Sequence, residues 1–365
     1  MKEKRGESRK PIRLIVLTFF LLLASCARKP VPVPPVVLHF AGDTMLGTLY
    51  PTPMLTPGGV SEVLRDAAPA LTNGRPDFVV VNLEGSVSTR GGATKDVSTG
   101  LDWCFRMPVA AAKCLKTAGV DLVTTANNHA YDFGPTGYAE TRSNLAAAGV
   151  GYFGDKGEVL VKSVRSNRVA FLGFEWMEPF ESILDIPACA RAVSNARVSN
   201  AIVVCFFHGG AEGEVAQHVS NRMEYYADNP RGNVVAFARA MVDAGASLVI
   251  GASPHLPRAM EIYSNRLIAY SLGNFATVRM FETTTTRKFS MVLRVEVDTN
   301  GVFRTGRIVP LIQDASGSTK GVPRPDPASN VIAVVRTLSR EDIPGNPLLV
   351  LSDGTLSNGA PGSRR

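Results

Sequence analysis

Five short apolar runs in this sequence each end at a motif that carries polar or ionisable side chains. The runs span residues 36–40, 78–81, 122–125, 202–207 and 248–251. The motifs that follow them are Gly42-Asp43, Asn82-Leu83-Glu84, Asn127-Asn128-His129, His208-Gly209-Gly210 and Pro254-His255. Runs of this length and composition are typical of buried strands. Because open α/β sheets place ligands at the carboxyl ends of their strands, the pattern predicts one site built from these motifs.

Helical periodicity occurs in three segments between these runs. They span residues 108–119, 135–149 and 233–245; each ends at a glycine, and the first two begin at a proline. Two other segments, residues 159–174 and 290–311, predict antiparallel hairpins around Ser166-Asn167 and Asn300-Gly301. Alternating strands and helices predict an α/β fold with helices on the outside of the sheets.

The beginning of the chain has the composition of an export signal. Six basic residues lie in the first 13 positions, and an apolar run of 11 residues, 14–24, follows them. That run is too short to cross a bilayer of about 30 Å as a helix. It leads into Leu23-Ala24-Ser25-Cys26, which resembles a bacterial lipobox. We therefore expect residues 1–25 to be a lipoprotein signal peptide and Cys26 to carry lipid; an ordinary cleaved signal peptide is the alternative.

Composition divides the rest of the chain into three parts. Residues 26–36 are rich in proline and predict a stiff tether, and residues 37–312 predict the main domain. Residues 313–365 predict a loop, a short helix at 331–338 and a disordered tail from residue 352. Removal of residues 1–25 lowers the formal net charge from +7 to +3, so the charge gives no argument for a nucleic acid partner.

The cysteines left after this removal do not form a zinc-finger or CxxC pattern. Besides Cys26 they are Cys104, Cys114, Cys189 and Cys205. An exported compartment permits disulfides, but Cys114 lies in a predicted helix and Cys205 in a predicted buried strand. Free thiols and disulfides therefore both remain open.

The order and wording of the motifs resemble the bacterial capsule-synthesis protein CapA family, also called the poly-γ-glutamate synthesis family, whose domain is related to the calcineurin-like metallophosphatases. The most distinctive stretch is residues 126–134, which contains Asn127-Asn128-His129 and Asp132. Ser271-Leu272-Gly273-Asn274-Phe275 completes a series that starts at Leu38. The resemblance implies a four-layer α/β/β/α sandwich of the metallophosphatase type over residues 37–312.

The same resemblance implies a site for one or two divalent metal ions, with Mn, Zn or Fe as candidates. Carboxylate, amide and imidazole groups suit such ions, and a buried carboxylate is costly unless it is paired or bound to metal. Implied roles beyond metal binding are an acid/base function for His129, a catalytic or substrate-orienting function for Glu212, and substrate contacts for Asn127 and Asn274. The implied metal ligands are Asp43, Glu84, Asn128, His208 and His255.

Three positions depart from the family pattern. Ser253 stands where the family usually has a histidine, Gly209 where it often has tryptophan, and Gly213 where it often has tyrosine. A serine hydroxyl is a poor metal ligand compared with neutral imidazole. The departures therefore predict a weakened metal position and the loss of part of an aromatic wall.

Three hypotheses for function remain. The first is an envelope lipoprotein that synthesises or processes capsule or a poly-γ-glutamate-like polymer by metal-assisted hydrolysis or transfer. Its partners would be the anionic extracellular polymer or its synthesis machinery, and the lipid would anchor it to the outer membrane or the outer face of the plasma membrane. The second is a catalytically weakened lipoprotein that binds or assembles the polymer, and the third is a phosphoesterase. The sequence has no GxSxG motif, no phosphate-binding glycine loop and no dinucleotide fingerprint.

Overall fold

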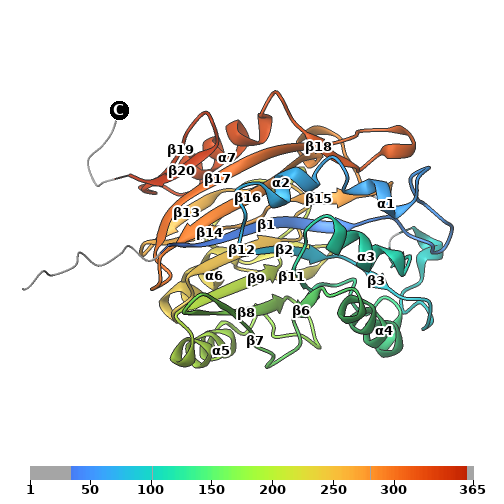
Figure 1. The fold of residues 1–365 in the computed structure, drawn as a ribbon, viewed down its shortest axis with the longest axis horizontal. Helices are drawn as coiled ribbons and strands as arrows, with labels where there is room; N and C mark the ends of the chain where they lie inside the picture. The colour runs from blue at the N-terminus through green and yellow to red at the C-terminus, as the bar shows by residue number, and fades with distance from the viewer. Residues whose placement is uncertain (1–33, 101, 280, 360–365) are drawn as a thin grey trace, which may run out of the picture. The chain divides into compact units, whose positions relative to one another are not determined.

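Two large β-sheets face each other (Figure 1), and the apolar side chains between them form the central core. A computed structural model describes residues 34–100, 102–279 and 281–359. The predicted signal peptide, Cys26 and most of the proline-rich tether lie outside the described residues, so the structure does not test them. Among the described residues, no helix combines the length and apolar character that crossing a membrane requires.

The first sheet has ten strands and contains the first three motif-bearing runs. Its path is β19-β20-β17-β16-β1-β2-β5-β6, with β15 paired to β1 and β18 to β17. The strands β1, β2, β5 and β6 run parallel to one another. The bounds are β1 (Val36–Met45), β2 (Phe78–Leu83), β5 (Leu122–Thr124), β6 (Gly151–Phe153), β15 (Asn274–Thr277), β16 (Phe289–Val297), β17 (Phe303–Gln313), β18 (Pro323–Pro325), β19 (Leu348–Val350) and β20 (Thr355–Asn358).

The second sheet has six strands in the order β13-β14-β12-β9-β8-β7 and contains the other two runs. Its central strands β8, β9, β12 and β14 are parallel. The bounds are β7 (Leu160–Val164), β8 (Asn167–Glu175), β9 (Ile202–His208), β12 (Leu248–Ala252), β13 (Met260–Tyr263) and β14 (Arg266–Ala269). Two small ribbons, β3 (Ser86–Val87) with β4 (Arg106–Met107) and β10 (Glu224–Tyr226) with β11 (Asn229–Gly232), lie outside the large sheets.

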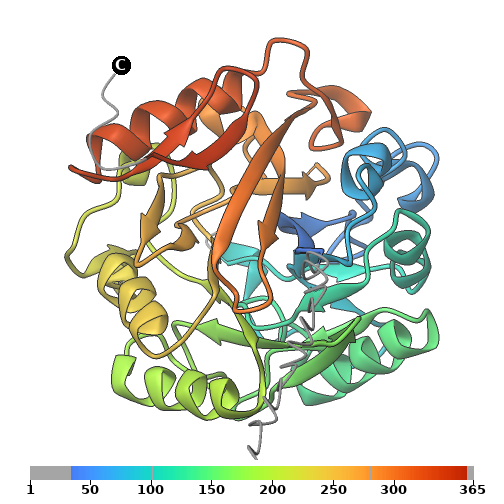
Figure 2. The same ribbon diagram turned by 60° about the vertical axis from the view of Figure 1, so that its left-hand side comes forward.

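Helices cover the outer face of each sheet, and they lie on opposite sides in the view of Figure 2. The first sheet packs against α1 (Val60–Val63), α2 (Ala68–Thr72) and α3 (Ala110–Thr117), and Leu145 of α4 (Gly134–Ala147) joins the same cluster. The second sheet packs against α5 (Ile186–Ser199) and α6 (Val234–Asp243). This is the predicted α/β/β/α order of four layers, and the prediction is confirmed.

The strongest local patterns gave elements close to their predicted bounds. The helices predicted at 108–119, 135–149 and 233–245 are α3, α4 and α6, and the predicted hairpins are β7–β8 and β16–β17. The four cysteines in the described residues are free thiols. Helix α5 was not predicted. Its buried face consists of Cys189, Val193 and Ala196, which is too small an apolar stripe to stand out in the sequence.

The C-terminal segment differs from the prediction. The short helix predicted at 331–338 is α7 (Asn330–Glu341), and three of its apolar residues, Val331, Ile332 and Val335, enter the core between the sheets. The disordered tail predicted from residue 352 is wrong for residues 352–359, because β20 pairs with β17 and β19 and buries Leu356 completely. Backbone pairing to two strands and the burial of Leu356 together place this polar stretch in the first sheet.

Candidate metal centre

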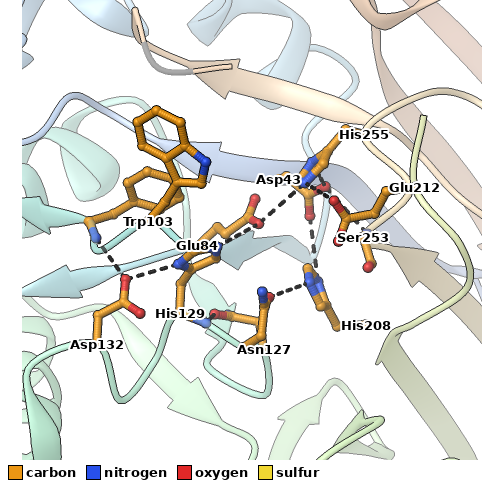
Figure 3. A network of polar contacts seen from close by, with 12 residues as sticks. Asp43, Glu84, Trp103, Asn127, His129, Asp132, His208, Glu212, Ser253 and His255 are labelled. Atoms are coloured by element: carbon orange, nitrogen blue, oxygen red, sulfur yellow. Dashed lines mark hydrogen bonds and ion pairs between the residues drawn. The ribbon is translucent and has the colours of Figure 1, made fainter. Parts of the chain in front are cut away.

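The five motifs meet at the carboxyl ends of strands from both sheets (Figure 3). Asp43 lies in β1, and Glu84 directly follows β2. His208 is the last residue of β9, and His255 follows β12 on a short loop. Parallel strands bring these ends to the same edge, so residues 41 to 212 positions apart in the sequence come together. The structure thus gathers the predicted site residues in one region.

Asp43, Glu84 and His255 form a group that could hold a metal ion. Each offers one ligand atom, and these atoms all lie within 4.8 Å of one another. Both carboxylate oxygens of Glu84 are buried without a hydrogen-bond partner. Burial, followed by the nearby charge of Asp43, raises the pKa of Glu84 well above its ordinary value. A buried carboxylate in this condition is costly, and a divalent cation would offset the cost, so the residues fit such an ion.

Asp43 is held by donors on both of its carboxylate oxygens. Asn82 Nδ2 donates to Oδ1 at 2.8 Å, and the Ser253 amide donates to Oδ2 at 3.3 Å. Burial raises the pKa of Asp43, but His255, His208 and Asn82 together outweigh burial and hold the pKa below its ordinary value. Asp43 is therefore kept as an oriented anion.

His255 presents one ring nitrogen to the metal group. Its Nδ1 lies 3.1 Å from Asp43 Oδ2 and 3.0 Å from Asn274 Oδ1; a carboxylate only accepts, so Nδ1 carries a proton. Nε2 lies 3.8 Å from Glu84 Oε1 and 3.8 Å from Glu212 Oε2. Burial lowers the pKa of His255, but Glu84, Asp43 and Glu212 raise it more, to about 10. These carboxylates attract a positive charge to Nε2, as a proton or as a metal ion.

His208 and Asn128 lie at the site but are hydrogen-bonded to each other. His208 Nε2 lies 2.9 Å from Asn128 Oδ1, and Asn82 Nδ2 donates to Nδ1 at 3.3 Å. Burial lowers the pKa of His208 to about 3, although Asp43 opposes this effect. The ring is therefore neutral, and protein atoms occupy both of its nitrogens. His208 would have to give up one of these contacts to become a metal ligand, whereas Asn128 Oδ1 keeps a second lone pair.

His129 is oriented by Asp132, a residue to which the sequence pattern assigned no role. His129 Nδ1 lies 2.9 Å from Asp132 Oδ2, so Nε2 is left on the side of Glu84, 4.0 Å from its Oε1. Lys95 Nζ donates to Asp132 Oδ1 at 2.7 Å, and the Phe105 amide donates to Oδ2 at 2.7 Å. Burial lowers the pKa of His129, and Asp132 partly opposes it. The three-residue spacing from His129 to Asp132 could have revealed this pair.

Asn127 and Asn274 differ from their predicted role in substrate contact. Both are 1% exposed, and neither lines the cavity at the site. Asn127 donates to Asn82 Oδ1 and to the Leu83 carbonyl, at 2.9 Å each. Asn274 instead accepts from His255. Both amides hold other residues of the site in position through these hydrogen bonds. Asn82, at the centre of this network, was missed as a site residue.

A cavity of about 450 Å³ opens beside the metal group. His129, His255, Asn128 and Glu212 line it, together with aromatic residues and three basic residues. The predicted residue Glu212 accepts a hydrogen bond from Arg231 at 2.7 Å. The aromatic residues are Trp103, Phe105, Trp176, Tyr226 and Phe281, and the basic residues are Lys95, Arg231 and Arg287.

Two of the departures from the family pattern have local explanations. A Cβ at Gly209 would lie 2.3 Å from Ile183 Cδ1, so Ile183 occupies the space that a larger residue would need. Ser253 is fully buried, and its Oγ has no hydrogen-bond partner. Its φ of 102° is unusual for a residue other than glycine. The serine therefore stands in the site region but adds no contact through its hydroxyl.

Residues 37–278 match the protein family described as bacterial capsule synthesis protein PGA_cap. The chain is 28% identical over 256 residues to the PGA biosynthesis protein CapA of Bacillus subtilis, which covers 65% of this chain and 62% of that protein. It is 26% identical over 304 residues to the capsule biosynthesis protein CapA of Bacillus anthracis, covering 75% and 69% of the two chains. It thus spans less than two thirds of the Bacillus subtilis relative.

Two solved structures are also similar. A putative 5'-nucleotidase from Staphylococcus aureus in complex with α-ketoglutarate aligns with a TM-score of 0.45 at 13% identity, covering 83% of this chain and 58% of the other. The NAD nucleotidase NadN of Haemophilus influenzae aligns with a TM-score of 0.41 at 11% identity, covering 86% of this chain and 57% of the other.

Proposed function

This chain belongs to the bacterial capsule synthesis protein family PGA_cap, and we propose that it synthesises or processes a capsule or poly-γ-glutamate-like polymer by metal-assisted hydrolysis or transfer. The names of the two Bacillus relatives, PGA biosynthesis protein and capsule biosynthesis protein, support the polymer. The geometry of the strand-end site supports the chemistry.

The observation that carries the proposal is the unpartnered carboxylate of Glu84 beside Asp43 and His255. These three residues would hold a divalent ion, with Mn, Zn and Fe as candidates because the ligands combine carboxylate and imidazole. Such an ion, when bound, polarises a carbonyl oxygen and lowers the pKa of a bound water. Asn128 could add its Oδ1 to the ligand set, and His208 could add a ring nitrogen only if one of its hydrogen bonds opened.

Proton transfer is assigned to His129. Its Nδ1 donates to Asp132, so Nε2 can accept a proton from an attacking group in the cavity and then give that proton to the leaving group. The proximity of Nε2 to Glu84, at 4.0 Å, places this nitrogen beside the metal group. Glu212 would orient the substrate, because its Oε1 is held by Arg231 and its Oε2 faces His255.

A second candidate function is polymer binding or assembly with little turnover. The pairing of His208 with Asn128, and the serine at position 253, favour it. Both features reduce the number of protein groups that are available to bind metal.

A mechanism with two ions needs more such groups than a mechanism with one. We therefore propose one tightly held ion rather than two.

The protein is further proposed to act in the cell envelope. The lipobox-like sequence at Cys26 supports lipid anchoring, and several acyl chains on one cysteine give stable membrane attachment. The anionic polymer or its synthesis machinery would be the partner at that surface.

The test is metal analysis and activity of residues 36–365, which lack the proposed anchor. Glu84→Gln should lose the metal found in the wild type and any hydrolysis of γ-glutamyl substrates. Glu175→Gln is the matched control, because Glu175 is also buried with both carboxylate oxygens unpartnered but is outside the metal group. Metal without turnover on γ-glutamyl or phosphoester substrates would support the binding function. Equal metal content in wild type and Glu84→Gln would refute the proposed centre.

A further inference from the structure

The segment from Phe281 to Lys288 forms one wall of the cavity. The ring of Phe281 packs against His255 and Phe105, with centroid distances of 4.6 Å and 5.2 Å. Further along, Thr285 donates a hydrogen bond to Glu214. These contacts fix the wall beside the metal group at one end and beside residues 213–216 at the other. Arg287, which follows in the same segment, lines the cavity.

Arg287 differs from the other two basic residues of the cavity in its pairing. Lys95 forms an ion pair with Asp132 at 2.7 Å, and Arg231 forms one with Glu212 at 2.7 Å. Within the part of the chain that the structure describes, the Arg287 guanidinium has neither an ion-pair nor a hydrogen-bond partner, and its Nε is buried. A partly buried, unpaired cation is costly, so this position is suited to an anion that the protein itself does not supply.

Gly213 provides the room for this guanidinium. A Cβ at Gly213 would lie 2.6 Å from Arg287 Nη2, and the φ of 87° also disfavours any other residue there. The Gly213 amide donates to the Pro254 carbonyl at 3.3 Å, which joins this position to the loop that carries His255. Where the family often has tyrosine, Gly213 therefore leaves room for the Arg287 guanidinium on the cavity wall.

We propose that Arg287 binds a carboxylate group of the substrate in the cavity beside the metal centre. The planar guanidinium can donate two parallel hydrogen bonds to one carboxylate. Exposed aromatic side chains on the same cavity, Trp103 and Tyr226, offer apolar surface to the methylene groups between successive carboxylates. This inference names the substrate contact and rests on the proposed function.

The attraction of an anion to the cavity depends on Arg287, because of the other charges that line it. Asp102 and Glu282 also line it and are exposed. Lys95 and Arg231 are neutralised by their partners, so removal of Arg287 leaves, among the described lining residues, acidic groups as the charges without an ion-pair partner. Loss of Arg287 should therefore replace attraction of an anion by repulsion.

The test is equilibrium binding of a short γ-linked glutamate oligomer to the full chain at low salt. Arg287→Gln should weaken binding by about tenfold or more, as loss of charged hydrogen bonds predicts, and Arg287→Lys should bind with intermediate affinity. Lys288→Gln is the matched control, because Lys288 lies in the same segment over the ring of Phe289 and does not line the cavity. It should bind like the wild type. Thermal unfolding of each variant checks that the fold is intact.

Two further ligands identify the anion. An oligomer with its free carboxyl groups amidated should bind the wild type as weakly as the acidic oligomer binds Arg287→Gln. Inorganic phosphate should compete poorly. Equal binding of the acidic oligomer by wild type and Arg287→Gln, equal binding of the amidated oligomer, or strong competition by phosphate would overturn the carboxylate assignment.

Measuring hydrolysis as well as binding distinguishes a failure of the carboxylate site from a failure of the catalytic proposal. Arg287-dependent binding without hydrolysis by the wild type would support the carboxylate site and count against the catalytic proposal. Hydrolysis that Arg287→Gln leaves unchanged in both KM and binding would support the catalytic proposal and refute the carboxylate site.

Discussion

His129 and Asp132 form a buried hydrogen-bonded pair, with His129 Nδ1 2.9 Å from Asp132 Oδ2. The carboxylate can only accept, so the pair fixes the tautomer and directs Nε2 towards Glu84 and the cavity. Lys95 and the Phe105 amide hold Asp132 in turn. The pair thus links the most distinctive motif of the sequence to the wall of the cavity.

Asp132→Asn should lower turnover by about 10²-fold with little change in metal content, because His129 would lose its fixed tautomer. Metal content and kcat are measured for Asp132→Asn, His129→Ala and the double variant. If Asp132 acts through His129, the double variant should be no slower than His129→Ala. Additive losses would show that Asp132 acts separately.

A pH effect on stability is expected from His39, which lies on β1 four residues before Asp43 but outside the metal group. Its Nδ1 contacts the Leu71 carbonyl at 2.8 Å, and its Nε2 is buried without a partner. Burial lowers the pKa of His39, and Arg294 adds to this effect. As pH falls through about 6.5, His39 is therefore protonated in the unfolded chain before it is protonated in the folded protein. Below that pH the free energy of unfolding falls by up to about 1.4 kcal/mol per pH unit.

Urea unfolding at several pH values between neutral and mildly acidic measures this effect. His39→Gln keeps a donor for the Leu71 carbonyl and cannot titrate, so its stability should fall less steeply with decreasing pH. Parallel slopes for wild type and variant would assign the acid sensitivity to other groups.

Membrane attachment is expected to depend on Cys26. In cells, Cys26→Ala should release the protein from the membrane or leave it unprocessed, because the thiol is the proposed point of lipid attachment. Fractionation and mass spectrometry measure both outcomes. Cys114→Ala is the control and should behave as the wild type. Unchanged mass and attachment in Cys26→Ala would contradict the lipoprotein hypothesis.

The sequence could predict the layers and the strand-end residues because both depend on local patterns. Apolar runs gave β1, β2, β9 and β12, and the side chains just beyond them could only lie at the sheet edge. Asp43, Glu84 and His255 therefore came together from strand order alone, without knowledge of any contact.

Pairings between distant segments could not be predicted in this way. The bond between His208 and Asn128 joins residues 80 positions apart, and both look like free ligands in the sequence. Arg287 follows no apolar run, and its place on the cavity depends on how Phe281 packs against His255. Glu175 ends β8 beside His208 but lacks a motif. Such residues become visible only when the sheets are packed together.

Ser253 is the position at which a metal site of this kind can be strengthened. The residue is fully buried, its amide donates to Asp43 Oδ2 at 3.3 Å, and its Oγ has no partner. An imidazole here would supply a ligand type that the described metal group contains only in His255. Ser253→His should therefore raise the number or affinity of bound ions, and should raise hydrolysis if His129 serves as the acid. The larger ring in a buried place should lower the stability of the metal-free protein.

Titration of Mn²⁺ and Zn²⁺ into the wild type, Ser253→His and His255→Ala measures this, with Ser253→Phe as a control of similar size but without a ligand. His255→Ala should lose affinity, because Nε2 is the nitrogen facing Glu84 at 3.8 Å. Ser253→Phe should lose stability without gaining metal, since its ring offers no nitrogen to an ion. If wild type, Ser253→His and His255→Ala bind alike, the strand ends hold no metal at these residues. The protein would then be better described as a polymer-binding module.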